Sequence, residues 1–561
     1  MSARPQPSLA LEGTVLFVVL VASAALRFGA AIADDDLILH SMSGDARGTV
    51  GWICETLRAY DVDGARFVFG DMLTSERIIA GPEPLPLMTW PWRARYVLAG
   101  HLVGPLNVYE AVIATFWVLN GLCAYALGRS VTGGRLGGLF VMGAVLAHEN
   151  FDIRAFVHNG HASYWAALLT VLWTVKVSRE PSTRNFYLLA LFLALGLMEN
   201  EYYGYYGGVF ATAFLLTHYR RELRVLRTSV GFRTAAVCGA LLAIPLLLTY
   251  PTLFLERPLV RLGFLESTSM PGVITRDNDF IGLSLLLADI PRLFAPGGWF
   301  PGALSGRPIE WEMTYRFGLL MTLFGVILYR FNRQRSELVV PFAVAAVVLV
   351  FFSLSGRYAI SLAHVTSLVA PMLRVTTRAL FFVDVTVFLA VGALLQSQWP
   401  DAKAAHRAAL VIGAVLAIAD LRPSAAWAEE LPRTRHWEYD RETMTTLRNL
   451  PSGLLVTLPL RNVETDPPEP HYGRVEELCF HSHRILDVLP ETQASAALAR
   501  SLNDPSARSG ALEELGVNYV RFEESASDCD AEVCETPSPL RSLEAQRARV
   551  RAALDRLVPE P

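Results

Sequence analysis

The 561-residue sequence is poor in charged residues and in cysteine, and it contains no internal repeats or low-complexity tracts. Asp, Glu, Lys and Arg together make up 18% of the chain, whereas soluble domains contain about 25%. The formal net charge is −4, so basic residues do not outnumber acidic ones and nothing indicates a nucleic-acid partner. With 52% hydrophobic residues, the chain is predicted to be a polytopic membrane protein with a soluble part.

The six cysteines form no CxxC pair and no Cys/His spacing typical of a zinc site. Cys529 and Cys534 are close together in a polar segment, where they can form a disulfide if that segment faces an oxidising compartment. Two free thiols are the alternative, and the sequence leaves both open.

Apolar runs predict about eleven membrane spans, because a helix needs about 20 mostly apolar residues to cross a bilayer. Several runs are shorter and need neighbouring residues to extend them. The first run is preceded by one Arg and lacks a small-residue cleavage site, so we expect a retained helix rather than a cleaved signal. The runs cover residues 9–33, 108–128, 136–147, 162–175, 186–198, 205–218, 234–250, 315–330, 337–354, 378–396 and 407–420.

Basic residues are concentrated in alternate short connections between these runs, and the positive-inside rule places such connections in the cytoplasm. The N-terminus is then cytoplasmic, and everything after Leu421 lies outside. The outward-facing loops are residues 34–107, 148–161, 199–204, 251–314 and 355–377. The basic connections contain Arg129, Arg135, Lys176, Arg179, Arg184, Arg220, Arg221, Arg224, Arg227, Arg233, Arg330, Arg333, Arg335, Lys403 and Arg407.

After residue 420, in the tail of the chain, the long apolar runs end. Strand-like runs occupy residues 453–459 and 516–522, and helical patterns lie at about 490–502, 507–515 and 539–557. The predicted fold class is therefore mainly α, a polytopic transmembrane helical bundle with a C-terminal extracytoplasmic α/β domain. The predicted domains are 1–420, with long outer loops at 34–107 and 251–314, and 421–561.

Carboxylates are concentrated just after the first apolar run. Asp34, Asp35 and Asp36 follow the run directly, and Asp45 lies nine residues after the last of them. A carboxylate there can deprotonate a hydroxyl acceptor, and a carboxylate cluster can hold a divalent metal ion. The alternatives are a helix end in water for the cluster and an N-cap for Asp45.

The later outer loops add imidazoles, further carboxylates and arginines. His158 and His161 share one face if that segment is helical. Arginines can hold a phosphate and stabilise it as it leaves, so this set suits attack on a sugar carbon linked to a lipid phosphate. Structural hydrogen bonds for the histidines and head-group contacts for the arginines are the alternatives. The candidate binding residues are His158, His161, Glu201, Glu312, Arg374 and Arg378.

Short motifs in the same order resemble bacterial multi-spanning proteins of the GT-C glycosyltransferase superfamily, especially its YfhO-like branch. The resemblance covers nearly the whole chain, although each motif is short. The motifs include Gly44-Asp45, Asn120-Gly-Leu-Cys-Ala-Tyr125, Asn159-Gly-His161, Glu201-Tyr-Tyr203, Pro371-Met-Leu-Arg374, Arg378-Ala-Leu-Phe381 and Leu450-Pro-Ser-Gly-Leu-Leu-Val456.

The resemblance implies transfer of a sugar from a polyprenyl-phosphate donor to a glycan, lipid or protein acceptor outside the bacterial cytoplasmic membrane. It implies a first-loop aspartate as catalytic base, with Asp45 the best match and Asp35 the second. The family's usual acidic pair stands at residues 34–36 here, so the choice between the two stays open. No cofactor other than a divalent metal ion is suggested.

Two other classes of protein fit the same sequence features. A flippase or transporter of a lipid-linked glycan needs charges deep inside its helices, and Asp384 is the main example. A non-catalytic cell-envelope assembly protein could keep the fold without the chemistry.

Overall fold

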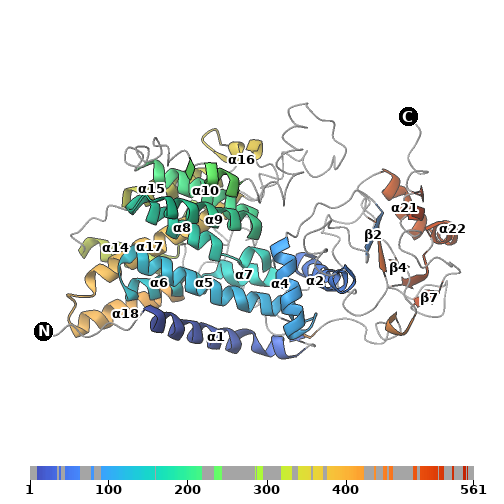
Figure 1. Cartoon of the computed structure of the whole chain (residues 1–561), viewed down its shortest axis with the longest axis horizontal. Coiled ribbons are helices and arrows are strands. Elements are labelled where there is room, and N and C mark those ends of the chain that lie inside the picture. Colours follow the sequence, from blue (N-terminus) through green and yellow to red (C-terminus); the bar gives the residue numbers. More distant parts are fainter. Residues whose placement is uncertain are drawn as a thin grey trace. The chain divides into compact units, whose positions relative to one another are not determined.

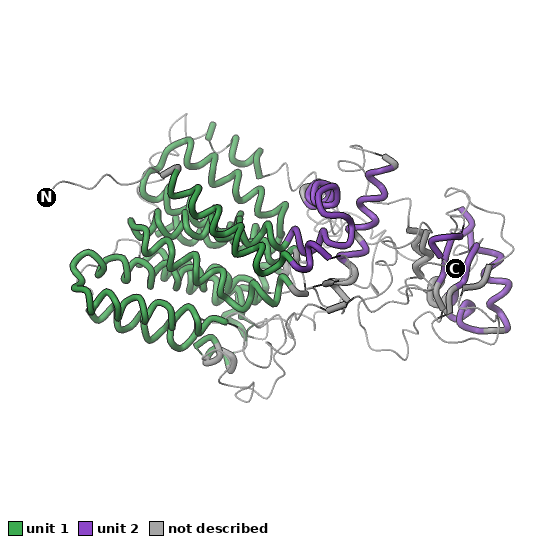
Figure 2. The backbone as a smooth tube through the Cα atoms, turned by 90° about the horizontal axis from the view of Figure 1, so that it is seen from below, with its two compact units in different colours: residues 1–29, 113–266, 273–433 green, residues 30–112, 267–272, 434–561 purple. Residues whose placement is uncertain are grey.

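The computed structural model forms two compact units, coloured separately in Figure 2. One contains residues 1–29, 113–266 and 273–433, and the other contains residues 30–112, 267–272 and 434–561. The residues that the structure describes are 9–34, 37–38, 44–63, 77–80, 90–157, 159–217, 233–234, 236–242, 285, 287–294, 317–331, 339–354, 358–369, 376–422, 435–436, 447–450, 454–458, 484–488, 493–515, 517–522, 533–535, 548–550 and 552–553.

The first unit is a bundle of helices (Figure 1). Helices α8, α9 and α10 pack on one another, and α17 packs between α6, α14 and α15. The bundle's α-helices are α1 (Leu9–Ala33), α5 (Val108–Thr132), α6 (Arg135–Ala147), α7 (Glu149–Val157), α8 (Trp165–Arg179), α9 (Thr183–Glu199), α10 (Glu201–Leu216), α14 (Leu319–Phe331), α15 (Val339–Ser353), α16 (Ala363–Val369), α17 (Leu380–Gln398) and α18 (Ala404–Ala419). The 3-10 helices are η1 (Asn159–Ala162), η4 (Leu287–Phe294) and η6 (Thr376–Ala379).

Among the described residues, three helices are long and apolar enough to cross a membrane: Leu11–Ala33, Val108–Thr132 and Thr376–Gln398. Helices α6, α14, α15 and α18 are apolar but shorter. Large apolar side chains on α1, α14, α15 and α18 face outward; Leu26 is 90% exposed. Water would disfavour so much apolar surface, whereas lipid would not. The molecule is therefore a membrane protein, and the count of about eleven spans stays a prediction.

Aromatic rings fill the interior of the bundle. Phe382 of α17 is fully buried and stacks on Phe210 of α10, with ring centroids 5.8 Å apart. Phe210 in turn stacks on Phe214 at 5.7 Å. These contacts hold α10 against α17, the two helices that begin beside the site described below.

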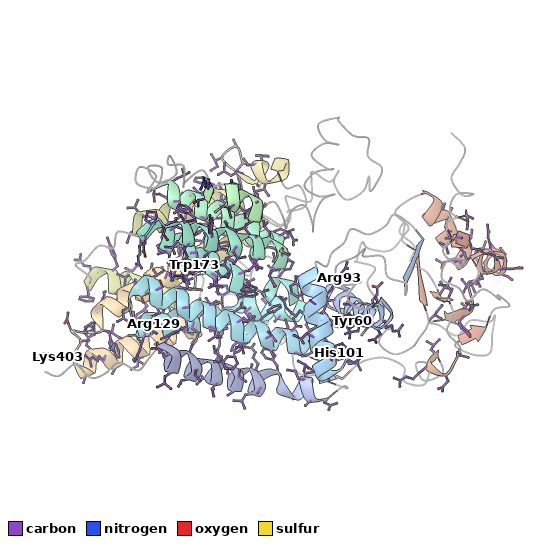
Figure 3. The ribbon with its side chains drawn as sticks, viewed as in Figure 1. Tyr60, Arg93, His101, Arg129, Trp173 and Lys403 are labelled. Atoms are coloured by element: carbon purple, nitrogen blue, oxygen red, sulfur yellow. The ribbon has the colours of Figure 1, made fainter. Side chains whose placement is uncertain are left out.

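At one end of the bundle, Glu12 of α1 binds the α5–α6 connection. Its carboxylate accepts hydrogen bonds from Tyr125 and from Arg129, the latter at 2.7 Å, and pairs with Arg135 at 2.8 Å. Figure 3 shows Arg129 and Lys403 toward the same end of the bundle. Both residues belong to connections that the sequence predicts on one side of the membrane.

The second unit contains a five-stranded sheet with strand order β2-β5-β4-β6-β7, in which only β7 is antiparallel to its neighbour. Strands β4 and β6 and helices α21 and α22 confirm four elements predicted for the tail. Strand β2 was not predicted. It lies in the first long loop, residues 34–107, where no strand was expected. The unit's elements are β1 (Leu37–Ile38), α2 (Gly44–Asp63), β2 (Arg77–Ala80), α4 (Trp90–Val103), β3 (Arg435–His436), β4 (Leu454–Leu458), β5 (Arg484–Val488), α21 (Gln493–Asn503), α22 (Pro505–Leu515), β6 (Tyr519–Phe522) and β7 (Val533–Glu535).

Candidate functional site

The site is built on the connection between α9 and α10, which is the single residue Asn200. Its backbone is extended, with φ −159° and ψ 111°, and it ends one helix and begins the next. The side-chain Oδ1 accepts hydrogen bonds from the backbone N–H groups of Tyr202 at 3.1 Å and Tyr203 at 3.3 Å. Asparagine is among the best residues for this N-cap role, which explains why α10 begins here.

Helix η1 and the two residues after it lie against this turn. The side chain of Asn120 on α5 donates to the carbonyl of Ala162 at 2.7 Å and accepts from the N–H of Tyr164 at 2.9 Å. The Tyr203 hydroxyl donates to the carbonyl of His161 at 3.0 Å. The backbone that carries His161 is therefore fixed from α5 on one side and from α10 on the other.

Arg378 of η6 reaches the same place from the start of α17. Its side chain is buried, with 4% of the residue exposed. The guanidinium carbon lies 4.0 Å from the centroid of the Tyr202 ring, and Nη1 lies 3.4 Å from Nδ1 of His161. A guanidinium stays charged at any ordinary pH, so these contacts place a buried positive charge beside the imidazole.

Arg378 supplies a positive charge here, and the carboxylate residues Glu199 and Glu201 flank Asn200 in the chain. The N-terminus of α10 adds a partial positive charge to that of Arg378. Asn200 already occupies the N–H groups of Tyr202 and Tyr203, so these two donors of the helix terminus are engaged within the protein. An arginine and an imidazole N–H are common ligands of phosphate and carboxylate groups.

A layer of aromatic rings packs beside the site. Phe381, the second residue of α17, stacks on Tyr164 with ring centroids 4.6 Å apart and lies 5.1 Å from the ring of Tyr203. Ser163 donates to Oε2 of Glu199 at 2.9 Å, which ties the end of α9 to the residue beside Tyr164. These rings are buried, so the layer has little freedom to move.

A buried histidine–aspartate pair connects α6 with α17. Nε2 of His148 lies 3.3 Å from Oδ2 of Asp384. Nδ1 of His148 accepts the backbone N–H of Asn150 at 3.1 Å, so the proton of the neutral ring resides on Nε2, the nitrogen nearer the Asp384 carboxylate. Asn150 then donates to the Tyr164 hydroxyl at 2.7 Å and accepts from Arg154 at 3.1 Å.

A second ion pair joins α1 to α7. Arg27 Nη2 lies 2.5 Å from Asp152 Oδ1, and its guanidinium carbon lies 4.7 Å from the Trp117 ring centroid. Burial raises the pKa of Asp152 above its ordinary value, and Arg27 opposes this shift by stabilising the charged carboxylate. This pair fixes the position of α7, which leads into η1.

Three of the predicted site residues lie in the described part of this unit. His161 and Arg378 are adjacent, and Glu201 is the first residue of α10, directly after Asn200. Asp45 lies in α2, but its side chain is outside the described residues, as are Asp35, His158, Glu312 and Arg374. No group of three or more His, Cys, Asp or Glu able to hold a metal ion occurs among the residues that are described.

Sequence reasoning gave no site role to Asn200, or to Asn120, which entered only as the first residue of a motif. Both are neutral amides that bind backbone groups, so neither contributes a charge or a metal-ligand pattern to the sequence. The available signal for Asn200 was its position between an apolar run and the acidic and aromatic residues that open α10, where an N-cap is expected.

No protein-family model matches the sequence, and no curated protein matches it. Two similar solved structures are of the Archaeoglobus fulgidus oligosaccharyltransferase, one tethered to an acceptor peptide containing the NVT sequon and one in the apo form. Their TM-scores are 0.44 and 0.42 with 10% and 11% identity, and the matches cover 90% of this chain and 68% and 69% of theirs. Similarity at this level does not define a shared activity.

Proposed function

We propose that this membrane protein is a GT-C-type glycosyltransferase that moves a sugar from a polyprenyl-phosphate donor to an acceptor outside the cytoplasmic membrane. One observation carries the proposal: the buried guanidinium of Arg378 lies against His161 and over Tyr202, at the start of α10. Burying a cation inside a bundle of membrane helices costs free energy, so a buried arginine there indicates a function. Binding the phosphate of a lipid-linked donor is such a function.

In the proposed reaction, an acceptor hydroxyl attacks the sugar carbon that carries the phosphate. The carbon–oxygen bond to phosphate breaks, and its electron pair stays on the phosphate oxygen. Arg378 and His161 stabilise the negative charge that develops there. The hydroxyl proton passes to a base, a role that the family resemblance of the sequence assigns to a first-loop carboxylate, Asp45 first and Asp35 second.

The other predicted residues belong to the same proposal. His158, Glu201, Glu312 and Arg374 would bind the donor or the acceptor. A divalent cation held by first-loop carboxylates would help to neutralise the phosphate, but no step above depends on it. The site would face outward, with the N-terminus in the cytoplasm and the tail outside a bacterial inner membrane.

The buried pair of His148 and Asp384 favours a second candidate, a flippase or transporter of lipid-linked glycans, because ionisable residues inside membrane helices often belong to transport pathways. However, Nδ1 of His148 accepts a backbone N–H, and Nε2 faces Asp384. Nδ1 is thus engaged by the backbone and Nε2 lies beside a buried carboxylate, so both ring nitrogens face groups of the protein itself. This geometry fits a structural link between α6 and α17 better than a transport site.

The decisive test is incorporation of radiolabelled sugar from a polyprenyl-phosphate donor by membranes with and without the protein. We expect incorporation only with the protein, and Arg378→Lys should raise the donor KM about tenfold, because lysine keeps the charge but loses the planar fork. Arg330→Lys on the exposed end of α14 is the matched control and should behave as wild type.

Two results would overturn the proposal. If membranes with and without the protein incorporate label equally, the protein is not this transferase, and a non-catalytic assembly role gains support. If labelled lipid-linked glycan crosses the bilayer of reconstituted vesicles without transfer, the flippase alternative is correct.

A further inference from the structure

The hydrogen bonds around Asn200 determine which of its two side-chain ends faces His161. Oδ1 accepts the N–H groups of Tyr202 and Tyr203, and only an oxygen can do so. The amide nitrogen Nδ2 must therefore point the other way, where it donates to the carbonyl of Gly160 at 3.2 Å and contacts Nδ1 of His161. The start of α10 thus fixes the orientation of the amide.

Two donors consequently meet at one ring nitrogen. Nδ2 of Asn200 can only donate, and so can Nη1 of Arg378, which lies 3.4 Å from the same Nδ1. A proton on Nδ1 would place an N–H against both of these donors, and a ring protonated on both nitrogens would also add a second positive charge beside the guanidinium. Nδ1 must therefore carry the lone pair, and the ring proton must reside on Nε2.

We infer that Asn200 is a positioning residue that holds His161 neutral, with its proton on Nε2, as a hydrogen-bond donor rather than a base. The inference rests on the proposed function for its consequence: next to Arg378, such an imidazole binds the donor's phosphate and does not accept the acceptor's proton. The assignment deepens the site, because a histidine in a candidate active site would otherwise be the usual candidate for general base.

The substitution Asn200→Asp tests this assignment with little change of shape. Aspartate is an equally good N-cap, so α10 should still begin at the same residue. The change replaces the amide donor by a carboxylate oxygen, which can only accept. We expect the ring proton of His161 to move from Nε2 to Nδ1, and the donor KM to rise about tenfold with a smaller change in kcat, because Nε2 then has no proton to donate to the phosphate.

The measurement that a purely structural role would not alter is the protonation of the ring nitrogens. Nitrogen NMR of protein labelled with 15N-histidine in detergent micelles separates protonated from lone-pair ring nitrogens. The sequence contains 12 histidines, so the signal of His161 is identified by its loss in His161→Gln. Ser182→Ala, which removes the N-cap of α9 at its far end, is the matched control and should leave both the signal and the KM unchanged.

The outcomes separate this inference from the proposed function. A protonated Nδ1 in the wild-type protein overturns the inference, whatever happens in the variants. An unchanged His161 signal in a folded Asn200→Asp variant overturns it as well. If Nδ1 carries the lone pair in wild type and gains a proton in Asn200→Asp, the inference stands, even if the wild-type protein transfers no sugar and the proposed function fails.

Discussion

The close approach of α9 and α10 gives a stability prediction whose size can be worked out from the structure. A Cβ atom added at Gly204 would lie 2.4 Å from the backbone nitrogen of Leu197 and 2.5 Å from its Cα. Backbone atoms of a neighbouring helix cannot rotate away as a side chain can, so the helices must separate. Overpacking of this kind costs about 1–3 kcal/mol, and we expect Gly204→Ala to fall at the upper end.

The same separation should disturb the site, because Gly204 lies four residues after Asn200. Moving the first turn of α10 away from α9 would lengthen the two hydrogen bonds that Oδ1 of Asn200 accepts. A loss of about 3 kcal/mol corresponds to a fall in melting temperature of about 4 °C for a unit of this size. Thermal unfolding of the purified protein in detergent measures it.

Gly208→Ala is the matched control, because it lies one turn further along α10 and a Cβ there meets nothing within 4 Å. Alanine favours helix over glycine by about 1 kcal/mol, so this variant should be as stable as wild type or slightly more stable. Equal melting temperatures for Gly204→Ala and Gly208→Ala would refute the close packing of the two helices.

Three further predictions follow from the charged residues. Asp45→Asn should lower sugar transfer by about 10²–10⁴-fold if that carboxylate is the base; if transfer survives in both this variant and Asp35→Asn, the first loop is not catalytic. Reporter fusions at Arg224 and Ser506 should report opposite sides of the membrane, and same-side signals would reject the predicted topology. Ser506 lowers the pKa of Asp504 by hydrogen bonding, so this carboxylate stabilises the fold above its ordinary pKa and loses that effect as pH falls through the lowered value. Chemical unfolding of Asp504→Ala and wild type should therefore differ at neutral pH and converge in strong acid, and a difference that persists in acid would contradict this account.

The helical part of the fold was predictable because hydropathy acts locally. An apolar run long enough to cross a bilayer indicates a helix without knowledge of its neighbours, and α1, α5 and α17 fall where such runs predict them. Strand β2 was not predictable in the same way. Its four residues pair with β5, about 400 positions later in the sequence, and a short apolar stretch carries no mark of so distant a partner.

Only the ionisable residues of the site could be predicted from the sequence. Arginine and histidine at the ends of apolar runs pointed to Arg378 and His161, which the structure brings together. Asn120 and Asn200 act through the directions of backbone carbonyls and N–H groups, and those directions exist only once the chain has folded. The sequence can therefore indicate Asn200 as an N-cap, but not that its amide also faces His161.

The one-residue turn between α9 and α10 has a consequence for the thickness of the surrounding lipid. The two helices have 17 and 16 residues, so each is roughly 25 Å long at about 1.5 Å per residue, shorter than a hydrocarbon layer of about 30 Å. If α9 and α10 are the membrane spans that the sequence predicts at residues 186–198 and 205–218, a turn of one residue adds no length, and either the bilayer thins there or Asn200 lies below the head groups. We expect activity in reconstituted vesicles to fall as acyl chains lengthen, because the start of α10 then sinks away from the aqueous acceptor. Equal rates in short- and long-chain lipids would place the turn clear of the hydrocarbon.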